Sequence, residues 1–300
     1  MKCMELTINQ FEILTNIIVE NDKLSQRRIS ELTGLSLGTV NKTLLELSDN
    51  NYITDEYKIT KSGIEALEPY KVKRAIILAA GFGSRLVPIT LNTPKPLVLV
   101  NGKKIIETLL DAIVAAGIPE IIIVTGYLHE CFDILLKKYS NIKLVYNSKY
   151  NEANNISSAY LVRDKFESAY VLDSDLYLTN QKLIRKYEYR SNYLGIRVDR
   201  TDDWCLETKN GIITDEKIGG MNCYQMAGIA YYNSTDGKRL NQDIYDVYNS
   251  PGGKEKFNEQ VALIDKKENY KIYIRECNRG DIIEIDTFNE LKAIDKSYDV

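Results

Sequence analysis

Residues 75–97 read AIILAAGFGSRLVPITLNTPKPL and carry the clearest fold signal in the chain. They begin with a continuous apolar run, which is typical of a parallel strand buried on both faces of a sheet. Two glycines follow the run and allow a tight turn, and two cations, Arg85 and Lys95, stand shortly after them. The stretch therefore predicts a strand that ends in a loop able to bring backbone amides and positive charge to an anionic ligand.

The alternation of apolar strands and helices continues beyond this stretch. The strand-like runs are residues 75–80, 120–126, 143–147 and 168–175, and the helical patterns between them are residues 105–117 and 130–139. Such an order implies right-handed β-α-β crossovers and helices that cover the sheet. We therefore expect an α/β fold over residues 70–300, with a mostly parallel, Rossmann-like sheet in three layers.

Residues 1–69 follow a helical pattern instead. Apolar residues recur at spacings of three and four in three successive segments: Phe11, Leu14, Ile17 and Ile18, then Ile29, Leu32 and Leu35, then Val40, Leu44 and Leu47. Gly34 separates the second segment from the third, Ser36 is placed to cap the third helix, and a short ribbon is expected at residues 52–63. This order resembles a winged helix-turn-helix domain, which we expect over residues 1–69.

Winged helices often bind DNA, so the charge of this region matters. Residues 1–70 hold seven Lys or Arg and eleven Asp or Glu, which gives 7 − 11 = −4. The expected recognition helix, SLGTVNKTLLEL, offers Lys42 as its one cation. Because DNA affinity rests mainly on cations that displace counterions, the charge argues against strong DNA binding. Dimerisation of the chain or docking of a partner stays open as another role for this domain.

The totals describe an ordinary globular chain. The 300 residues have a formal net charge of −3, and no apolar run is long enough to cross a membrane. The first twenty residues mix Glu and Gln among the apolar residues, unlike a signal peptide. The five cysteines are an odd number without C-x-x-C spacing, and the chain has one His, so neither a zinc site nor a disulfide framework is suggested. We expect a cytoplasmic protein.

The glycine pair after the first strand has three interpretations. A dinucleotide fingerprint needs a third glycine at position 86, where the chain has Leu86, and a P-loop needs a Gly-Lys-Ser/Thr sequence that is absent. The remaining functional interpretation is a nucleotide-binding loop, in which Arg85 and Lys95 converge on a triphosphate. The alternative is a glycine turn beside surface cations.

The joint spacing AGFGSRLVPITLNTPKPL resembles the Gly-x-Gly-x-Arg…Pro-Lys signature of the nucleotidyltransferase superfamily, which activates sugars and alcohol phosphates. The domain is similar to the bacterial CTP:phosphocholine cytidylyltransferases in segments that span it, residues 124–133, 146–164, 170–178, 201–207 and 282–294. The resemblance implies an enzyme that transfers CMP from CTP to phosphocholine, with CDP-choline and pyrophosphate as products. The amino-terminal domain lies outside this resemblance.

The resemblance also implies the residues that carry the reaction. Asp175, at the end of a buried strand, and Asp286, in the strand-like IIEID, match the family's metal ligands and should hold one Mg²⁺. Lys95 and Arg85 should stabilise the charge of the transition state and of pyrophosphate. Asp173, two positions before Asp175, is expected as a supporting partner or a strand-end cap, although a role as ligand stays open.

A further set of residues is expected to bind the nucleotide. It comprises the backbone around the glycine turn, two cavity asparagines and neighbours: Leu78, Ala79, Ala80, Gly81, Gly83, Arg85, Tyr127, Asn154 and Asn155. The segment NNISS could instead hold only a helix cap beside an Asx turn, since Asn and Ser favour both positions.

The acceptor site is expected around Trp204, the one tryptophan of the chain. By resemblance, Trp204 helps to hold the choline headgroup. Among its neighbours, Asp202, Asp203 and Glu207 could supply negative charge, and Phe257 or Tyr224 could form a second wall. A quaternary ammonium has no N–H to donate, so aromatic faces and carboxylates recognise it.

The late acceptor loop departs from the family pattern. Where the phosphocholine enzymes carry a Tyr-Trp pair before an acid, this chain reads EKFNEQ at residues 255–260. A site with fewer aromatic walls and more polar groups favours a primary ammonium, so phosphoethanolamine and 2-aminoethylphosphonate are alternative acceptors. A sugar-1-phosphate nucleotidyltransferase and a nucleotide-sensing transcriptional regulator are further alternatives.

Overall fold

The computed structural model of the chain describes residues 5–20 and 24–299 and shows two compact units, Met1–Lys71 and Val72–Val300. The first unit is helical: α1 (Ile8–Glu20), α2 (Gln26–Thr33), α3 (Leu37–Asp49) and α4 (Lys61–Leu67). Its helices bury the apolar residues that their periodicity indicates, including Phe11, Ile29 and Leu44. The wing is smaller than the expected ribbon, because Ile53 and Ile59 form a single β-bridge and Thr60 already caps α4.

The local signals that separate α2 from α3 behave as the sequence indicates. Gly34 adopts the left-handed conformation, with φ of 70°, and its N–H bonds the carbonyl of Ser30, which ends α2. The hydroxyl of Ser36 accepts a hydrogen bond from the backbone N–H of Thr39 and so caps α3.

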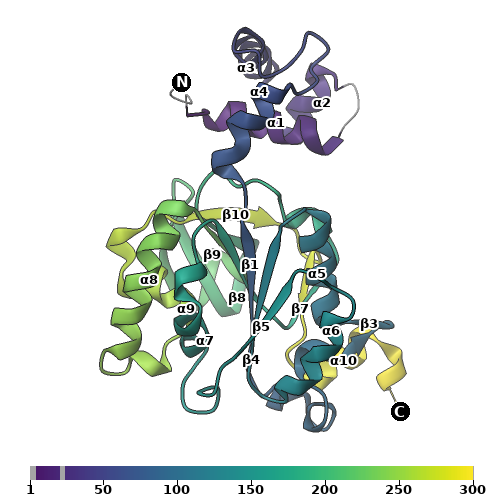
Figure 1. Cartoon of the computed structure of the whole chain (residues 1–300), viewed down its shortest axis with the longest axis vertical. Helices are drawn as coiled ribbons and strands as arrows, with labels where there is room; N and C mark the ends of the chain where they lie inside the picture. Colours follow the sequence, from purple (N-terminus) through teal and green to yellow (C-terminus); the bar gives the residue numbers. More distant parts are fainter. Residues whose placement is uncertain (1–4, 21–23, 300) are drawn as a thin grey trace. The chain divides into compact units, whose positions relative to one another are not determined.

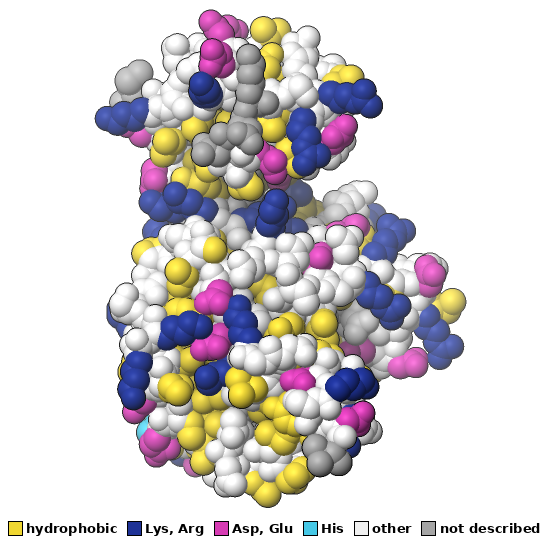
Figure 2. All heavy atoms as spheres, turned by 90° about the vertical axis from the view of Figure 1, so that its right-hand side faces the viewer, with side chains coloured by type: hydrophobic (Ala, Val, Ile, Leu, Met, Phe, Trp, Pro, Cys, Tyr) yellow, Lys and Arg dark blue, Asp and Glu magenta, His cyan; other side chains and the backbone are white. Residues whose placement is uncertain are grey.

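The cations of α2 and α3 are paired with acids. Arg27 and Arg28 of α2 lie 3.6 and 3.4 Å from Glu31, and Lys42 of α3 lies 3.9 Å from Glu46. On the face of the molecule shown in Figure 2, side chains of both charges are interspersed. The expected recognition helix therefore offers little uncompensated positive charge.

The second unit is built on a seven-stranded sheet in the order β10-β8-β9-β6-β1-β4-β5. The strands are β1 (Arg74–Ala79), β4 (Glu120–Thr125), β5 (Ile142–Tyr146), β6 (Ala169–Asp173), β8 (Asn192–Lys209), β9 (Ile212–Tyr232) and β10 (Tyr273–Cys277). The four strands expected from the apolar runs lie side by side and parallel as β5-β4-β1-β6. The long strand β9 pairs antiparallel with both β6 and β8, so the sheet is mixed although mostly parallel.

Helices cover both faces of this sheet and give three layers (Figure 1). On one side lie α5 (Ile105–Ala115) and α6 (Asp133–Leu136), and on the other α7 (Ile156–Leu161), α8 (Ser234–Asn249) and α9 (Asn258–Gln260). Side chains of β1 alternate between the two apolar cores, since Ile77 packs with α5 whereas Ile76 and Leu78 pack toward the other face. The helix expected at 130–139 is shorter than the pattern indicates, because α6 follows a 3₁₀ turn at His129–Phe132.

A two-stranded ribbon beside the main sheet joins distant segments. β7 (Leu176–Leu178) pairs antiparallel with β11 (Ile282–Glu284), and α10 (Phe288–Ile294) follows. A second ribbon, β2 (Leu99–Val100) with β3 (Lys103–Lys104), precedes α5.

Two sequence-level expectations concern the whole chain. Among the residues described, no helix is both long and apolar enough to cross a membrane. Cys3 lies outside the described residues, and Cys131, Cys205, Cys223 and Cys277 carry free thiols.

Candidate active site

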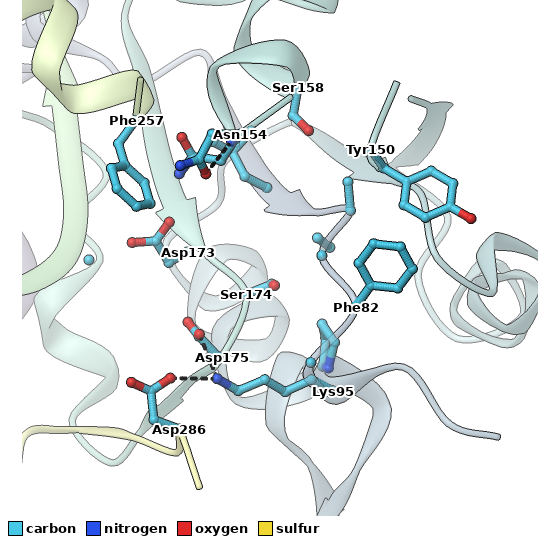
Figure 3. A pocket seen from close by; sticks show the side chains of 18 of the residues that line it. Phe82, Lys95, Tyr150, Asn154, Ser158, Asp173, Ser174, Asp175, Phe257 and Asp286 are labelled. Carbon is cyan, nitrogen blue, oxygen red and sulfur yellow. Dashed lines mark hydrogen bonds and ion pairs between the residues drawn. The ribbon is translucent and has the colours of Figure 1, made fainter. Parts of the chain in front are cut away.

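The carboxyl ends of β1 and β6 open into a cavity of about 540 Å³. This is the edge at which open α/β sheets bind ligands. The expected residues that line the cavity are Leu78, Ala79, Ala80, Gly81, Gly83, Arg85, Lys95, Asn154, Asn155, Asp175, Asp203, Trp204, Phe257 and Asp286. Figure 3 shows how several of them, from segments far apart in the sequence, face one space.

Gly83 is the glycine of the loop that the geometry requires. Its φ of 62° is left-handed, and a Cβ there would lie 2.8 Å from the Cβ of Lys95. Its carbonyl accepts hydrogen bonds from the Thr90 hydroxyl, at 2.8 Å, and from the Leu86 N–H, at 3.0 Å. The loop is thereby folded against the stem of Lys95, which explains the spacing between the glycines and the lysine.

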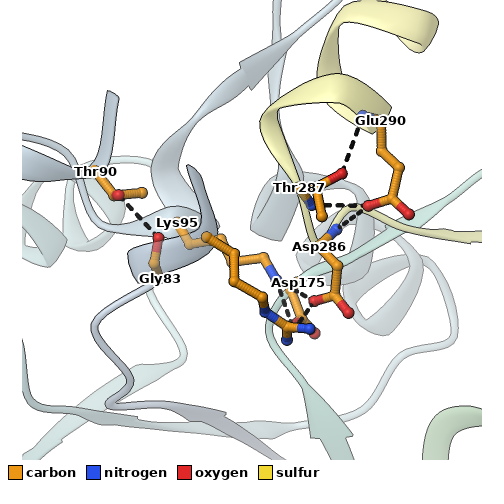
Figure 4. Close-up of polar contacts among 8 residues, drawn as sticks. Gly83, Thr90, Lys95, Asp175, Asp286, Thr287 and Glu290 are labelled. Atoms are coloured by element: carbon orange, nitrogen blue, oxygen red, sulfur yellow. Dashed lines mark hydrogen bonds and ion pairs between the residues drawn. The ribbon is translucent and has the colours of Figure 1, made fainter. Parts of the chain in front are cut away.

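Lys95 lies at the centre of a charge network (Figure 4). The residue is 7% exposed, and its Nζ lies 2.8 Å from an oxygen of Asp175 and 2.8 Å from Oδ1 of Asp286. Burial lowers the pKa of Lys95, but the charges and hydrogen bonds of the two aspartates outweigh it, so the net shift is upward. Lys95 is therefore a fixed positive charge at neutral pH.

Arg85 contributes to the same network from its rim. Its guanidinium donates a hydrogen bond of 2.8 Å to Oδ1 of Asp286, while 66% of its side chain is exposed. The backbone N–H of Asp286 donates to Glu290, which also accepts from the N–H of Thr287 at the start of α10. Asp286 is held in place by these bonds, whereas the Arg85 side chain is largely exposed at the rim of the cavity.

Three carboxylates form a group that could hold a metal ion. One oxygen each of Asp175, Glu284 and Asp286 lies within 4.8 Å of the others. Antiparallel pairing places Glu284 opposite Leu176, next to Asp175, and so brings the two segments together. Oxygen donors of this kind suit a hard divalent cation such as Mg²⁺. Burial of the Glu284 carboxyl group is the main cause that raises its pKa to about 8, and the negative charges of Asp175 and Asp286 raise it further.

Two aromatic side chains flank the glycine loop. Phe82 and Tyr150 line the cavity with ring centroids 5.2 Å apart (Figure 3). Tyr127, which the sequence places near the nucleotide, does not line the cavity: its hydroxyl donates to the carbonyl of Leu91, and its ring lies 5.3 Å from that of Phe82. Phe82 and Tyr150 therefore supply the aromatic rings on this side of the cavity, and Tyr127 packs behind Phe82.

Asn154 and Asn155 line the cavity and also fasten the late acceptor loop. The backbone N–H of Asn154 donates to the carbonyl of Lys254 at 2.7 Å, and its side-chain amide to that of Glu255. The side-chain oxygen of Asn155 accepts from the N–H of Asn258 at 2.7 Å. These bonds tie the start of α7 to residues 254–258, a role beyond helix capping.

The far end of the cavity is aromatic and acidic. Trp204 is half-buried, and its ring lies edge-on to Phe257 with centroids 5.7 Å apart. Asp203 lines the same end and is exposed, and Asp173 and Glu259 face it from β6 and α9. In Figure 3, Phe257 and Asp173 lie on the side of the cavity away from Lys95.

Two of the residues expected at the acceptor end lie elsewhere. Glu207 forms an ion pair with Lys217 across the β8–β9 pair and does not line the cavity. The Tyr224 hydroxyl donates to Glu276 on β10, outside the cavity. The register shifts of the β8–β9 pair between Thr201 and Thr208 alter the alternation of side chains, so spacing from Trp204 does not predict which neighbours share its side.

Sequence reasoning missed Phe82, Tyr150, Glu259 and Glu284 as cavity residues. For Glu284 a signal existed: it lies two positions before Asp286 in the strand-like IIEID, and residues two apart on a strand share a face. Glu259 lies within EKFNEQ, the segment that departs from the family pattern, and its carboxylate gave a signal beside the aromatic and the amide. Phe82 and Tyr150 had no signal beyond proximity to cavity-forming segments.

Comparisons with known proteins agree with this architecture. The sequence profile of the Nucleotidyl transferase family matches residues 74–218, and that of the winged helix-turn-helix DNA-binding family matches residues 6–54. The 2-aminoethylphosphonate cytidylyltransferase of Lancefieldella rimae is 36% identical over 75% of this chain and 92% of its own length. The choline-phosphate cytidylyltransferase of Streptococcus pneumoniae is 35% identical over 74% of this chain and 97% of its own length.

A solved structure supports the same assignment. The CTP:phosphocholine cytidylyltransferase from Streptococcus pneumoniae superposes with a TM-score of 0.70 at 33% identity, over 75% of this chain and 98% of that chain. Relatives at this identity, aligned over most of their length, share the family of the chain. The chain therefore belongs to the nucleotidyltransferase family, as an enzyme of the cytidylyltransferase type that carries an amino-terminal winged helix-turn-helix region.

Proposed function

We propose that this enzyme transfers CMP from CTP to a small phosphate or phosphonate that bears an ammonium headgroup, in the presence of Mg²⁺. Phosphocholine, phosphoethanolamine and 2-aminoethylphosphonate are the acceptors of this class. An anionic oxygen of the acceptor attacks the α-phosphorus of CTP, the bond from that phosphorus to the bridging oxygen breaks, and pyrophosphate leaves. No protein nucleophile is needed, because the attacking oxygen is already ionised near neutral pH.

The end of the cavity that holds Lys95 and the three carboxylates, called here the reaction end, would neutralise the charge of the reacting phosphates and position them. Asp175, Glu284 and Asp286 would hold Mg²⁺, which neutralises phosphate charge when bound. Lys95 places a buried ammonium against the same group, and Arg85 adds an exposed guanidinium for the departing pyrophosphate. The amides of the glycine loop and the rings of Phe82 and Tyr150 would face the nucleotide.

One observation carries the choice of acceptor class. Trp204 and Phe257 form an edge-on aromatic pair at the end of the cavity where Asp203 and Glu259 place carboxylates. Aromatic faces and carboxylates together attract a cation, whereas a sugar phosphate calls for neutral hydrogen-bonding groups. Two aromatic walls and several carboxylates can accept either a quaternary or a primary ammonium, in keeping with relatives named for phosphocholine and for 2-aminoethylphosphonate.

Pyrophosphate release tests this proposal. The purified chain is incubated with Mg²⁺ and each of the four nucleoside triphosphates, and with each of phosphocholine, phosphoethanolamine, 2-aminoethylphosphonate and glucose-1-phosphate. We expect release with CTP and with at least one ammonium-bearing acceptor, and none with glucose-1-phosphate. The proposed function would be rejected if glucose-1-phosphate were the one acceptor that turned over, or if no acceptor turned over with any nucleotide.

DNA binding is a second candidate function, favoured by the family match of residues 6–54. The pairing of Arg27, Arg28 and Lys42 with acids in their own helices weakens it, since each phosphate contact would first have to break an ion pair. Retention of the full chain on random duplex DNA at low salt tests the function. Free passage would leave dimerisation or partner docking, which light scattering of the chain would separate.

A further inference from the structure

A second cavity, of about 370 Å³, lies in the same unit as the active site but shares none of its lining residues. Its basic lining residues are Lys182, Arg185, Arg197 and Arg279, and its acidic ones are Glu276 and Asp281. Their formal charge is 4 − 2 = +2, although the whole chain has a net charge of −3. The proposed reaction gives no role to this concentration of positive charge.

Three segments far apart in the sequence form the walls of this second cavity: residues 180–185, β8, and the end of β10 with the loop that follows it. β10 is paired in register with β8. The guanidinium of Arg275 on β10 donates a hydrogen bond of 2.6 Å to the carbonyl of Leu183. The backbone N–H of Asn180 donates to the carbonyl of Asp281 at 3.2 Å. Hydrogen bonds within the protein therefore hold the walls of the cavity together without a ligand.

The two acids of the second cavity are held by neutral hydrogen-bond donors. Asp281 accepts from the backbone N–H of Asn278 at 2.8 Å and from the side-chain amide of Asn180 at 3.2 Å. Glu276 accepts from the hydroxyl of Tyr224. These bonds keep both carboxylates in place, so the positive charge of the cavity is only partly compensated.

The arginines of the second cavity differ from their neighbour on β10. Arg275 is ion-paired with Glu188 at 3.0 Å, whereas Arg185 and Arg279 form no ion pair within residues 5–20 and 24–299. Arg185, Arg197 and Arg279 are exposed, and each comes from a different wall. A guanidinium group binds phosphate through two parallel hydrogen bonds, so three of them around one hollow suit an anion with several phosphate oxygens.

The arrangement of charge favours a compact anion over a nucleic acid. A nucleic-acid surface carries its cations along a stripe that follows the phosphate backbone. Here the cations gather around a single cavity, and Glu276 and Asp281 lie among them, where they would repel an extended run of phosphates. A short chain of linked phosphates places its charge in one spot and can contact all three walls.

We propose that the second cavity is a binding site for a small molecule that carries linked phosphate groups, with Arg185, Arg197 and Arg279 as the residues that bind the phosphate oxygens. The site is separate from the active site, and the inference does not depend on which acceptor the enzyme uses. No bond forms or breaks at this site, since its residues bind the anion through charge and hydrogen bonds alone.

Equilibrium dialysis of the full chain with radiolabelled tripolyphosphate, in EDTA and at low salt, tests the proposal. The unmodified enzyme and Lys95→Ala are both used as parents, because Lys95→Ala weakens binding of the same probe in the active site. In both parents, the added pair Arg185→Gln and Arg279→Gln should raise the Kd of the second cavity by about tenfold or more. The pair Lys186→Gln and Lys271→Gln removes the same charge from exposed residues outside the cavity and should bind as its parent does.

Orthophosphate serves as a second probe. A single phosphate group meets fewer guanidinium groups than a chain of three, so we expect the second cavity to bind it about tenfold or more weakly than tripolyphosphate. Random duplex DNA serves as a third probe, and the loss of Arg185 and Arg279 should not change its binding beyond the effect of the charge-matched pair.

Each outcome decides for or against the site. Equal affinity for tripolyphosphate in the arginine variant and in its charge-matched control would overturn the proposal, as would orthophosphate that binds as tightly as tripolyphosphate. Binding of duplex DNA that depends on Arg185 and Arg279, without binding of tripolyphosphate, would replace it with a nucleic-acid surface. None of these results bears on the proposed function, because turnover of CTP is measured separately.

A conservative variant keeps the proposal testable if the glutamine pair does not fold, as judged by its melting temperature. Arg185→Lys with Arg279→Lys keeps both charges but removes the planar forks. We expect its Kd for tripolyphosphate to rise by about threefold or more, since each bidentate contact is reduced to a point charge. An unchanged Kd in this variant would overturn the assignment of the two guanidinium groups as the phosphate ligands.

Discussion

The two ends of the cavity handle charge in opposite ways. At the reaction end, Lys95 lies 2.8 Å from both Asp175 and Asp286, so each of these acids has a cation within the protein. At the acceptor end, Glu259 lines the cavity and has no ion-pair partner among the described residues. Under the proposed function, the reaction end would be preorganised for an anionic nucleotide with its metal, whereas the acceptor end would lack a positive charge that the substrate brings.

The largest expected effect comes from breaking the metal group. Asp175→Asn keeps the shape of the side chain and removes its negative charge. We expect kcat to fall by about a thousandfold or more, because a bound metal supplies several kcal/mol of charge stabilisation. Initial rates of pyrophosphate release, with Mg²⁺ varied over a wide range, measure the loss.

Chelation provides the matched control for this variant. Treatment of the unmodified enzyme with EDTA should abolish turnover, and added Mg²⁺ should restore it. A near-normal rate in Asp175→Asn, with its melting temperature unchanged, would contradict the assignment of Asp175 as a ligand.

Removing the cation of the reaction end should have the next largest effect. Lys95→Ala deletes the ammonium that faces Asp175 and Asp286, and we expect kcat to fall by about 10²- to 10³-fold, the usual cost of one charge-stabilising group. The upward-shifted pKa of Lys95 keeps it charged below its ordinary value of 10.5, so loss of this charge should not limit the rate between pH 6 and 9. Single-turnover rates check the chemical step directly.

Lys95→Arg tests whether charge alone suffices. The guanidinium is planar and larger than the ammonium, and the side chain of Lys95 lies against Gly83, where a Cβ would already meet it at 2.8 Å. We expect partial recovery at most. Full recovery would show that a point charge at this position is not required.

Substitutions at the acceptor end should change the KM of the acceptor rather than the rate of the chemical step. Trp204→Ala removes the larger wall of the aromatic pair, and a cation–π contact is worth about 0.5–2 kcal/mol, which corresponds to a rise of about 2- to 30-fold in acceptor KM. The CTP KM should stay within a factor of about two. Trp204→Phe, which keeps an aromatic face, should recover part of the loss, and an equal rise in both KM values would argue against the headgroup site.

The same contrast explains what the sequence could predict. The reaction end is built from short motifs at strand ends, where Gly83, Lys95 and Asp175 each have a backbone reason for their position. Such local geometry follows from the order of strands and turns. Asp286 lies far along the chain, and the resemblance to known cytidylyltransferases, not spacing, pointed to it.

The residues at the acceptor end are set by strand register and by contacts between segments far apart in the sequence. A local pattern of residues does not predict these contacts. The bulged pairing of β8 with β9 turns Glu207 toward Lys217, and Tyr224 bonds Glu276 on β10 instead of facing the headgroup. Glu259 reaches the cavity because Asn154 and Asn155 fasten its loop through contacts about one hundred residues apart in sequence. These contacts exist only once the sheet and its connections have formed.

The smallest expected effect tests whether this placement is right. Glu207 was expected to supply negative charge beside Trp204, but its carboxylate pairs with Lys217 outside the cavity. Glu207→Gln should therefore leave the KM for phosphocholine and for 2-aminoethylphosphonate unchanged within error, because an exposed ion pair contributes little even to stability. Competition between the two acceptors in one reaction gives the most sensitive readout. If Glu207→Gln used one of the two acceptors selectively less well, Glu207 would belong to the headgroup site. The difference between the two ends of the cavity would then need to be revised.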